Sequence, residues 1–200
     1  MDLYRHHIMA AGPRGAAALA RRILEADAGQ GRLFGVFAPQ IGLSANHVVA
    51  ISRLEGEPEA APTLAGAHGA RLEREEIWEA DPRPLPGETF PERDGFLSHR
   101  WFDVMEADWP RFRELSVTAW DNFEGTHDTR VIGFWRGRTA PAPGLVRVWL
   151  MAWYKSLAAW EGSRWYLGSD RADAAQAYEN FRNRHEITQD TAVSLLRRVS

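Results

Sequence analysis

The sequence has no cysteine among its 200 residues. That absence excludes disulfide bonds, a thiol nucleophile, cysteine-ligated zinc and iron–sulfur clusters. An excess of positive charge is also lacking, since 24 Lys and Arg stand against 27 Asp and Glu, for a formal net charge of −3. Nucleic acid is therefore not an expected partner, because its binding requires a basic surface.

Long hydrophobic runs are missing as well. The longest, Val148–Tyr154, is far shorter than the ~20 apolar residues of a membrane-spanning helix. Residues 1–7 do not combine a basic head with an apolar run, so they lack the pattern of a signal peptide. We therefore expect a cytoplasmic protein with no membrane partner.

The common catalytic motifs are absent too. The sequence contains no Gly-rich phosphate loop, no Gly-x-Ser-x-Gly elbow and no His-Glu-x-x-His. No group of histidines has the spacing of a chelate, so we expect neither a metal nor a cofactor. What the sequence does contain is nine Trp and seven His. Any chemistry depends on where the fold brings these residues together.

The two halves of the sequence resemble each other. Three pairs of segments match in the same order along the chain. Leu3–Met9 matches Leu97–Asp103 at an offset of 94 residues. Two later pairs share an offset of 98 residues: Arg32–Phe37 with Arg130–Trp135, and Val48–Ile51 with Val146–Trp149. Apolar periodicity in each half indicates the order strand, helix, strand, strand, helix, strand. The matches indicate an internal duplication.

The repeated unit predicts an α+β fold. A βαββαβ unit is the ferredoxin-like arrangement, which covers one face of its sheet with helices and leaves the other bare. Two such sheets can bury their bare faces together as an eight-stranded barrel. We therefore expect two ferredoxin-like halves, residues 1–85 and 96–200, joined by a linker at 86–95, which form a dimeric α+β-barrel arrangement within one chain.

The second half also resembles a known family. Its Gly133–Trp135 strand (Gly-Phe-Trp), the Val146–Trp153 strand and the helix start at Tyr154–Glu161 are similar to those of the NIPSNAP family, members of the dimeric α+β-barrel superfamily. The first half keeps Gly35 and Phe37 but lacks the Trp and the Tyr-x-Ser-Leu start. The resemblance implies the barrel fold and a small-molecule ligand, and the sequence leaves open whether two chains form a homodimer. It implies no catalytic residues.

The matched first strands predict which side chains enter the barrel. An offset of 94 aligns Arg5 with His99 and His7 with Trp101, so these residues belong to one face of their strands. Asp103 lies further along the same face. The other face carries Tyr4, His6 and Ile8 in the first strand and Ser98, Arg100 and Phe102 in the second. We expect that second face to meet the helices, because its far end is apolar.

The interior set predicts a site for an aromatic or enolic substrate. A histidine suits general base catalysis near neutral pH, and an arginine can hold an enolate or carboxylate oxygen. Trp rings can form flat walls for a planar ligand. The expected catalytic residues are His99, His7 and Asp103, and the expected substrate-binding residues are Arg5, Trp101, Trp135 and Trp149. The leading function is that of a small-molecule enzyme or binding protein of the NIPSNAP type and, if it is an enzyme, cofactor-independent oxygenation or isomerisation.

Three alternatives stay open from the sequence. The interior His and Trp residues can instead be packing side chains of a plugged barrel. The chain can be a non-catalytic protein that binds a ligand or a protein partner. His185, which shares a helix face with Tyr178 and Phe181, can ligate haem iron, as a helix histidine does in some barrels of this superfamily. The charged run Arg71–Glu76 is interpreted as a solvated edge.

Overall fold

A computed structural model describes residues 2–27, 32–56, 69–91, 93–126, 128–165 and 174–200. A helix expected between Gly56 and Ala70 falls mostly outside these residues. Among the described residues, no helix has the length and apolar character needed to cross a lipid bilayer.

Eight antiparallel strands form a closed barrel, as expected from two packed sheets. Around the barrel they follow the order β1-β3-β2-β8-β5-β7-β6-β4, and pairing of β4 with β1 closes the ring. The strands are β1 Leu3–Ala10, β2 Leu33–Ile41, β3 His47–Leu54, β4 Arg71–Ala80, β5 Phe96–Met105, β6 Thr129–Gly137, β7 Leu145–Tyr154 and β8 Thr188–Arg198.

The ring consists of two arcs with the same internal order. The first-half strands run β4-β1-β3-β2 and the second-half strands run β8-β5-β7-β6, and the arcs meet where β2 pairs with β8 and β4 pairs with β6. The expected α+β fold, with two ferredoxin-like halves in one chain, is confirmed. The barrel therefore closes without a second copy of the chain.

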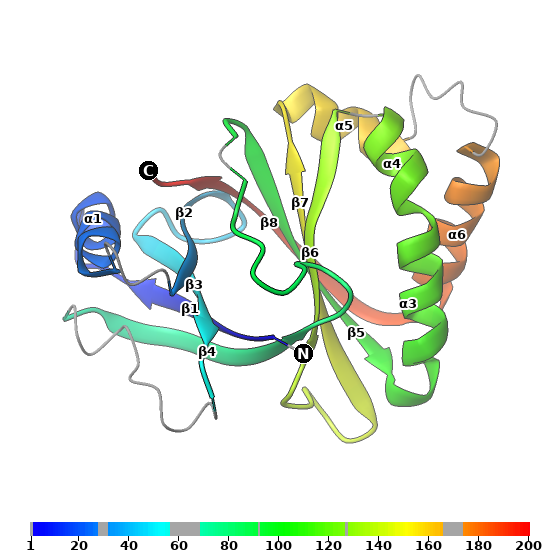
Figure 1. Cartoon of the computed structure of the whole chain (residues 1–200), viewed down its shortest axis with the longest axis horizontal. Helices are drawn as coiled ribbons and strands as arrows, with labels where there is room; N and C mark the ends of the chain where they lie inside the picture. The colour runs from blue at the N-terminus through cyan, green and yellow to red at the C-terminus, as the bar shows by residue number, and fades with distance from the viewer. Residues whose placement is uncertain (1, 28–31, 57–68, 92, 127, 166–173) are drawn as a thin grey trace.

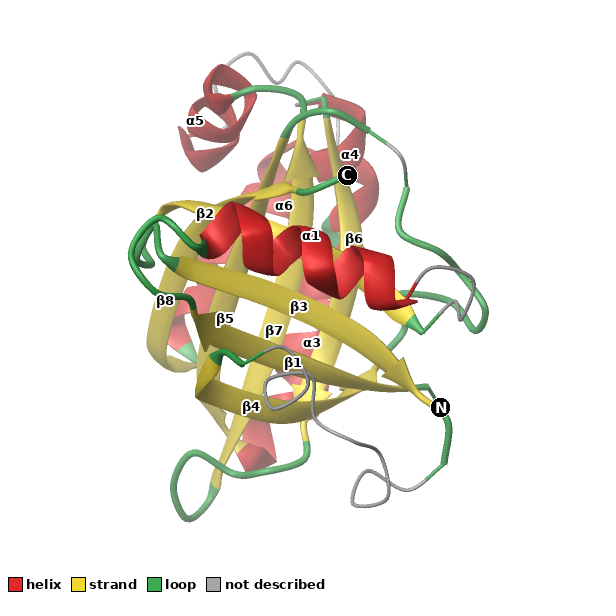
Figure 2. Ribbon diagram, turned by 90° about the vertical axis from the view of Figure 1, so that its left-hand side faces the viewer, coloured by secondary structure: helices red, strands yellow, loops and turns green. Residues whose placement is uncertain are grey.

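Helices cover the outside of the barrel on opposite sides. Figure 1 shows α3, α4 and α6 on one side and α1 on the other, and Figure 2 shows α1 lying across β3. The helices are α1 Ala16–Asp27, α3 Trp109–Thr118, α4 Trp120–Thr126, α5 Leu157–Trp165 and α6 Ala174–Glu186, with a short 3-10 turn at Glu106–Asp108.

The apolar spacing of Trp109, Phe112 and Phe123 predicts one long helix from Asp108 to Phe123, but the structure divides it at Ala119. The backbone N–H of Ala119 bonds to the carbonyl oxygens of Ser116 and Val117, and this tighter turn ends α3 before α4 begins. The buried face is nevertheless as expected, since Trp109, Phe112 and Phe123 all pack in the core between the helices and the second-half sheet.

Phe112→Ala is expected to lower the free energy of unfolding by about 3–5 kcal/mol, because Phe112 is fully buried and its ring meets those of Phe102 and Phe134. The measurement is chemical denaturation of the variant beside Arg111→Ala, a control at an exposed neighbouring position. An unchanged stability in Phe112→Ala would contradict the packing described here.

The linker between the halves seals one end of the barrel. Phe90 inserts into the barrel core, with its ring centroid 5.5 Å from that of Phe34 and 5.4 Å from that of Phe37. Tyr4 and Trp135 pack beside these rings. The expected linker is therefore a folded segment that closes the barrel at this end.

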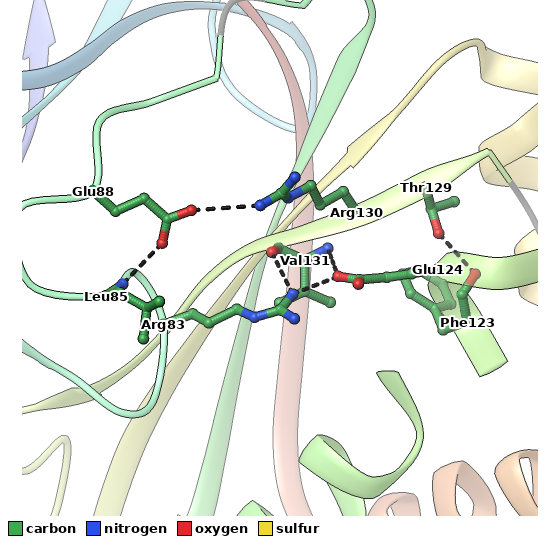
Figure 3. Close-up of polar contacts among 8 residues, drawn as sticks. All are labelled: Arg83, Leu85, Glu88, Phe123, Glu124, Thr129, Arg130 and Val131. Carbon is green, nitrogen blue, oxygen red and sulfur yellow. Dashed lines mark hydrogen bonds and ion pairs between the residues drawn. The ribbon is translucent and has the colours of Figure 1, made fainter. Parts of the chain in front are cut away.

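Polar contacts fix the linker to the second half (Figure 3). Arg83 donates from Nη1 to Oε1 of Glu124 at 2.5 Å and to the carbonyl oxygen of Val131 at 3.1 Å. Glu88 accepts from the backbone N–H of Leu85 at 2.9 Å and forms an ion pair with Arg130 at 3.5 Å. With this end sealed, a ligand would enter the barrel from the other end.

Candidate active site

A pocket of about 420 Å³ lies at the open end of the barrel. Its walls come from β1, β3, β4, β5, β7 and β8 and from the loop between β2 and β3. The side chains that carry its chemistry are His6, His47, Arg74, His99, Trp101, Asp103, Arg147 and Asp190. The volume suits a compact small molecule.

Two histidines form the inner end of this pocket. The rings of His6 and His99 lie 5.7 Å apart between centroids, and neither residue is more than 1% exposed. Among the described residues, neither ring nitrogen of His6 has a hydrogen-bond partner, and neither does Nε2 of His99. Buried polar atoms are normally hydrogen-bonded, so these three nitrogens are candidates for contact with a ligand.

Burial keeps both histidines neutral. Desolvation lowers the pKa of His99 to about 3. It also lowers the pKa of His6 well below its usual value, and His99, His7 and Arg74 add to this effect. At neutral pH both imidazoles therefore carry one N–H donor and one nitrogen acceptor.

Aromatic rings enclose the histidine pair. The His6 ring lies 5.1 Å from Trp101 and 4.9 Å from Trp149, and Trp101 stacks on Trp149 with centroids 5.7 Å apart. The guanidinium of Arg74 lies 5.7 Å above the Trp101 ring. Trp101 and Arg74 thus form one flat, cationic wall of the pocket.

An ion-pair network forms another wall. Arg147 donates from Nε and Nη2 to the carboxylate of Asp103 at 2.7 and 2.8 Å, and its Nη1 lies 3.5 Å from Oε1 of Glu76. The hydrogen bond to Asp103 raises the pKa of Arg147, while burial raises the pKa of Glu76. Asp103 is therefore bonded to an arginine of the neighbouring strand.

The expected placement of Arg5 and His7 inside the barrel is wrong. Tyr4 and Ile8 pack in the barrel core, while Met9 packs against α1, so Arg5 and His7 share the outer face with Met9. His7 is buried there and its Nε2 lies 2.8 Å from Oε2 of Glu75. Burial lowers its pKa, and Glu75 opposes that shift.

A one-residue error in register explains this misplacement. His6 pairs with Ile51 of β3, and His99 pairs with Met151 of β7. Ile51 also pairs with Gly35 of β2, and Met151 pairs with Gly133 of β6, so His6 and His99 occupy equivalent positions 93 residues apart. The sequence match at 94 instead aligned His99 with Arg5, and a one-residue shift moves every side chain of a strand to the other face.

The other expected residues divide between the pocket and the packed core. His99, Trp101 and Asp103 line the pocket as expected. Trp149 lies behind the histidines, and Trp135 stacks on it with ring centroids 4.1 Å apart. Both are fully buried and neither lines the pocket, so they support the site from below.

Four residues of the site are not predicted from the sequence: His6, Arg74, Glu76 and Arg147. The first four residues of the run Arg71–Glu76 are exposed, as a solvated edge predicts, and closure of the barrel also places Arg74 at the pocket mouth. The signal in the sequence that could have identified Arg74 is the alternation of side chains along a strand, which sends every second residue of this run to the inner face. Among the described residues, no group of three His, Asp or Glu is arranged to hold a metal ion.

Comparisons with known proteins support the fold. No protein-family model matches the sequence, and no curated protein matches it. Among solved structures, an anthrone oxidase-like protein matches all of this chain and 92% of its own, at 13% identity and a TM-score of 0.66. A putative monooxygenase from Fusobacterium nucleatum matches 100% and 93% of the two chains, at 9% identity and a TM-score of 0.61.

A putative monooxygenase from Lactobacillus acidophilus covers 98% of this chain and 93% of its own, at 10% identity and a TM-score of 0.59. These similarities extend over nearly the whole barrel, so the chain has the ferredoxin-like α+β-barrel fold in full. At such low identity they show the fold alone. None of the three is a NIPSNAP protein, and that resemblance stays a prediction.

Proposed function

We propose that this protein is an enzyme that binds a compact, planar hydroxy-aromatic or enolic molecule at the barrel mouth and transfers a proton from it to a neutral imidazole. The observation that carries the proposal is the buried pair His6 and His99 at the end of a pocket walled by Trp101, in which both ring nitrogens of His6 and Nε2 of His99 are unpartnered among the described residues. A hydroxyl or enolisable C–H of the ligand would supply the missing partner.

Burial makes His99 a weak base on its own, so the transfer depends on a counter-charge that forms beside it. An imidazolium formed alone at His99 would be unstable, because burial already lowers the pKa of that group to about 3. An enolate formed beside it would compensate the new charge at short range. Arg74, stacked on Trp101, could hold the enolate oxygen in the position that the sequence analysis assigned to Arg5.

Two reactions can follow from such an enolate. In isomerisation the imidazolium returns the proton to a different carbon, and no electrons leave the substrate. In oxygenation molecular oxygen is the oxidant, and the methylene carbon loses both hydrogens and becomes a carbonyl. One oxygen atom of the dioxygen molecule enters that carbonyl, and the other leaves with the two hydrogens as water.

The names of the structural neighbours favour oxygenation. One is an anthrone oxidase-like protein and two are putative monooxygenases, all matched across nearly their whole length. An anthrone is a planar ketone with an enolisable methylene group, which suits the histidine pair and the Trp101 wall. The pocket and those names together support the proposed substrate class.

The test is oxygen uptake with anthrone as the probe, followed together with anthraquinone absorbance. His6→Leu and His99→Leu are each expected to lower the rate by about 10²–10⁴-fold, the usual contribution of a general base. His185→Leu is the matched control and should keep the full rate, since that exposed residue lies outside the barrel pocket. Full activity in both barrel variants would contradict the proposal.

The non-catalytic alternative gives a different result in the same experiment. If the barrel only binds its ligand, the probe quenches Trp fluorescence in a His99-dependent way, while neither oxygen uptake nor isomerisation follows. The haem alternative has weaker support, because His185 is exposed to solvent and is the sole histidine lining its own cavity among the described residues.

A further inference from the structure

A second cavity lies on the other side of β5. This helix–sheet cleft, of about 370 Å³, is enclosed by the outer face of the second-half sheet and by α4, α5 and α6. Because strand side chains alternate, Ser98, Arg100 and Phe102 enter the cleft while His99 and Trp101 face the barrel pocket. The two cavities are separated by one strand.

The charged side chains of the cleft are all basic. Arg100, Arg164, Arg182, Arg184 and His185 line it, and among the described residues no Asp or Glu does. The whole chain has a net charge of −3, so a cleft lined only by basic groups differs in sign from the chain as a whole. A helix C-terminus favours cations, which accounts for the α6 residues but not for the arginine of β5.

Two of these arginines lack carboxylate partners. Among the described residues, no carboxylate lies within ion-pair distance of Arg100 or Arg164. Arg164 is exposed at the rim of the cleft, and Arg100 is half-buried within it.

The floor of the cleft is apolar. The guanidinium of Arg184 lies 4.8 Å from the ring centroids of both Phe102 and Phe181, and Phe123 and Leu150 complete the surface. Arg184 is only 9% exposed and donates to Oγ of Ser116 at 3.3 Å. The cleft therefore presents an aromatic surface beside cationic groups.

We propose that the helix–sheet cleft binds an amphipathic organic monoanion, an aromatic ring system that carries a carboxylate or sulfonate. The ring packs on the half-buried Leu150 and Phe181, and the anionic group reaches Arg100 and Arg182 at the rim. This site is independent of the barrel pocket and of the reaction proposed there.

The experiment compares two fluorescent probes of similar shape. One is 8-anilinonaphthalene-1-sulfonate, and the other is N-phenyl-1-naphthylamine, which lacks the sulfonate. We expect the anionic probe to bind at one site, and Arg100→Met to weaken its binding about tenfold while the neutral probe is unaffected. Arg182→Met gives a second variant that leaves the buried Arg184 intact.

The controls separate this site from others. Arg21→Met, at an exposed position of α1 on the opposite side, should change neither probe, and near-ultraviolet circular dichroism should show native packing in every variant. Equal weakening of both probes by Arg100→Met would overturn the anion site. So would loss of the anionic probe in His99→Leu alone, or a Soret band with added haemin that disappears in His185→Ala.

Discussion

Gly133→Ala is expected to lower the free energy of unfolding by at least about 3 kcal/mol, the cost of displacing a large core side chain. A Cβ atom at this position would lie 1.8 Å from Cη2 of Trp135, whose ring covers the glycine. Trp135 cannot move aside easily, because it stacks on Trp149 and packs against Tyr4 and Phe34.

The matched control is Gly162→Ala in α5, where an added Cβ meets no atom within 4 Å. Alanine is the better helix residue, so this variant should match or exceed the parent by up to about 1 kcal/mol. Both variants would be compared by urea denaturation. If the free energy of unfolding of Gly133→Ala lies within about 0.5 kcal/mol of the parent value, as is usual for a surface substitution, the Trp135 ring is not fixed over residue 133.

The stability of the protein is expected to fall steeply in mild acid. Folding lowers the pKa of His99 from its usual 6.5 to about 3, so between these pH values the unfolded chain binds a proton that the folded chain does not. The free energy of unfolding should therefore decrease by up to about 1.4 kcal/mol for each pH unit below the usual histidine pKa, and stay level above it. His6, shifted in the same direction, adds to the slope.

In His99→Leu, the free energy of unfolding should depend less steeply on pH between about pH 6 and pH 4, because the unfolded variant binds one proton fewer. Urea denaturation at each pH measures this dependence. Val49→Ala is the control, because it truncates a fully buried side chain of the same barrel core without removing a titratable group. It should lower stability equally at every pH. If His99→Leu keeps the parent's acid slope, His99 is not the buried neutral group described here.

The fold could be predicted from the sequence because two signals agree. The Gly-x-aromatic strands at Gly35 and Gly133 recur at a constant offset, and in the structure the aromatic ring two residues later, Phe37 or Trp135, lies over each glycine. The helix face of Trp109, Phe112 and Phe123 has clear periodicity and is buried as expected. Both signals are local, so they can be seen without knowing the strand pairing.

The phase of β1 could not be predicted, for a physical reason. Tyr4 to Met9 are buried on both faces, one inside the barrel and the other outside it. Such a strand has no alternation of polar and apolar residues to reveal its inner face. Because His6 and His7 are adjacent, a shift of one residue decides which of the two histidines lies inside the barrel and belongs to the candidate site.

The charged wall of the pocket depends on long-range pairing. Arg147 faces Asp103 because β5 and β7 pair with these residues opposite each other. Arg74 reaches the pocket mouth because β4 pairs with both β1 and β6 across the join between the halves. Neither relation is visible in the composition of a single segment, so the sequence identified Asp103 but not its partner.

The most direct test is nuclear magnetic resonance of ring-15N-labelled histidine during titration with 1-naphthol, a planar hydroxy-aromatic probe. Assignments come from the His6→Leu and His99→Leu variants. Binding at the barrel mouth should shift the signals of both ring nitrogens of His6 and of Nε2 of His99, which lack protein partners among the described residues, and leave the signals of His7 and His185 in place. Unchanged His6 and His99 signals at saturation, or shifts confined to His185, would contradict a site inside the barrel.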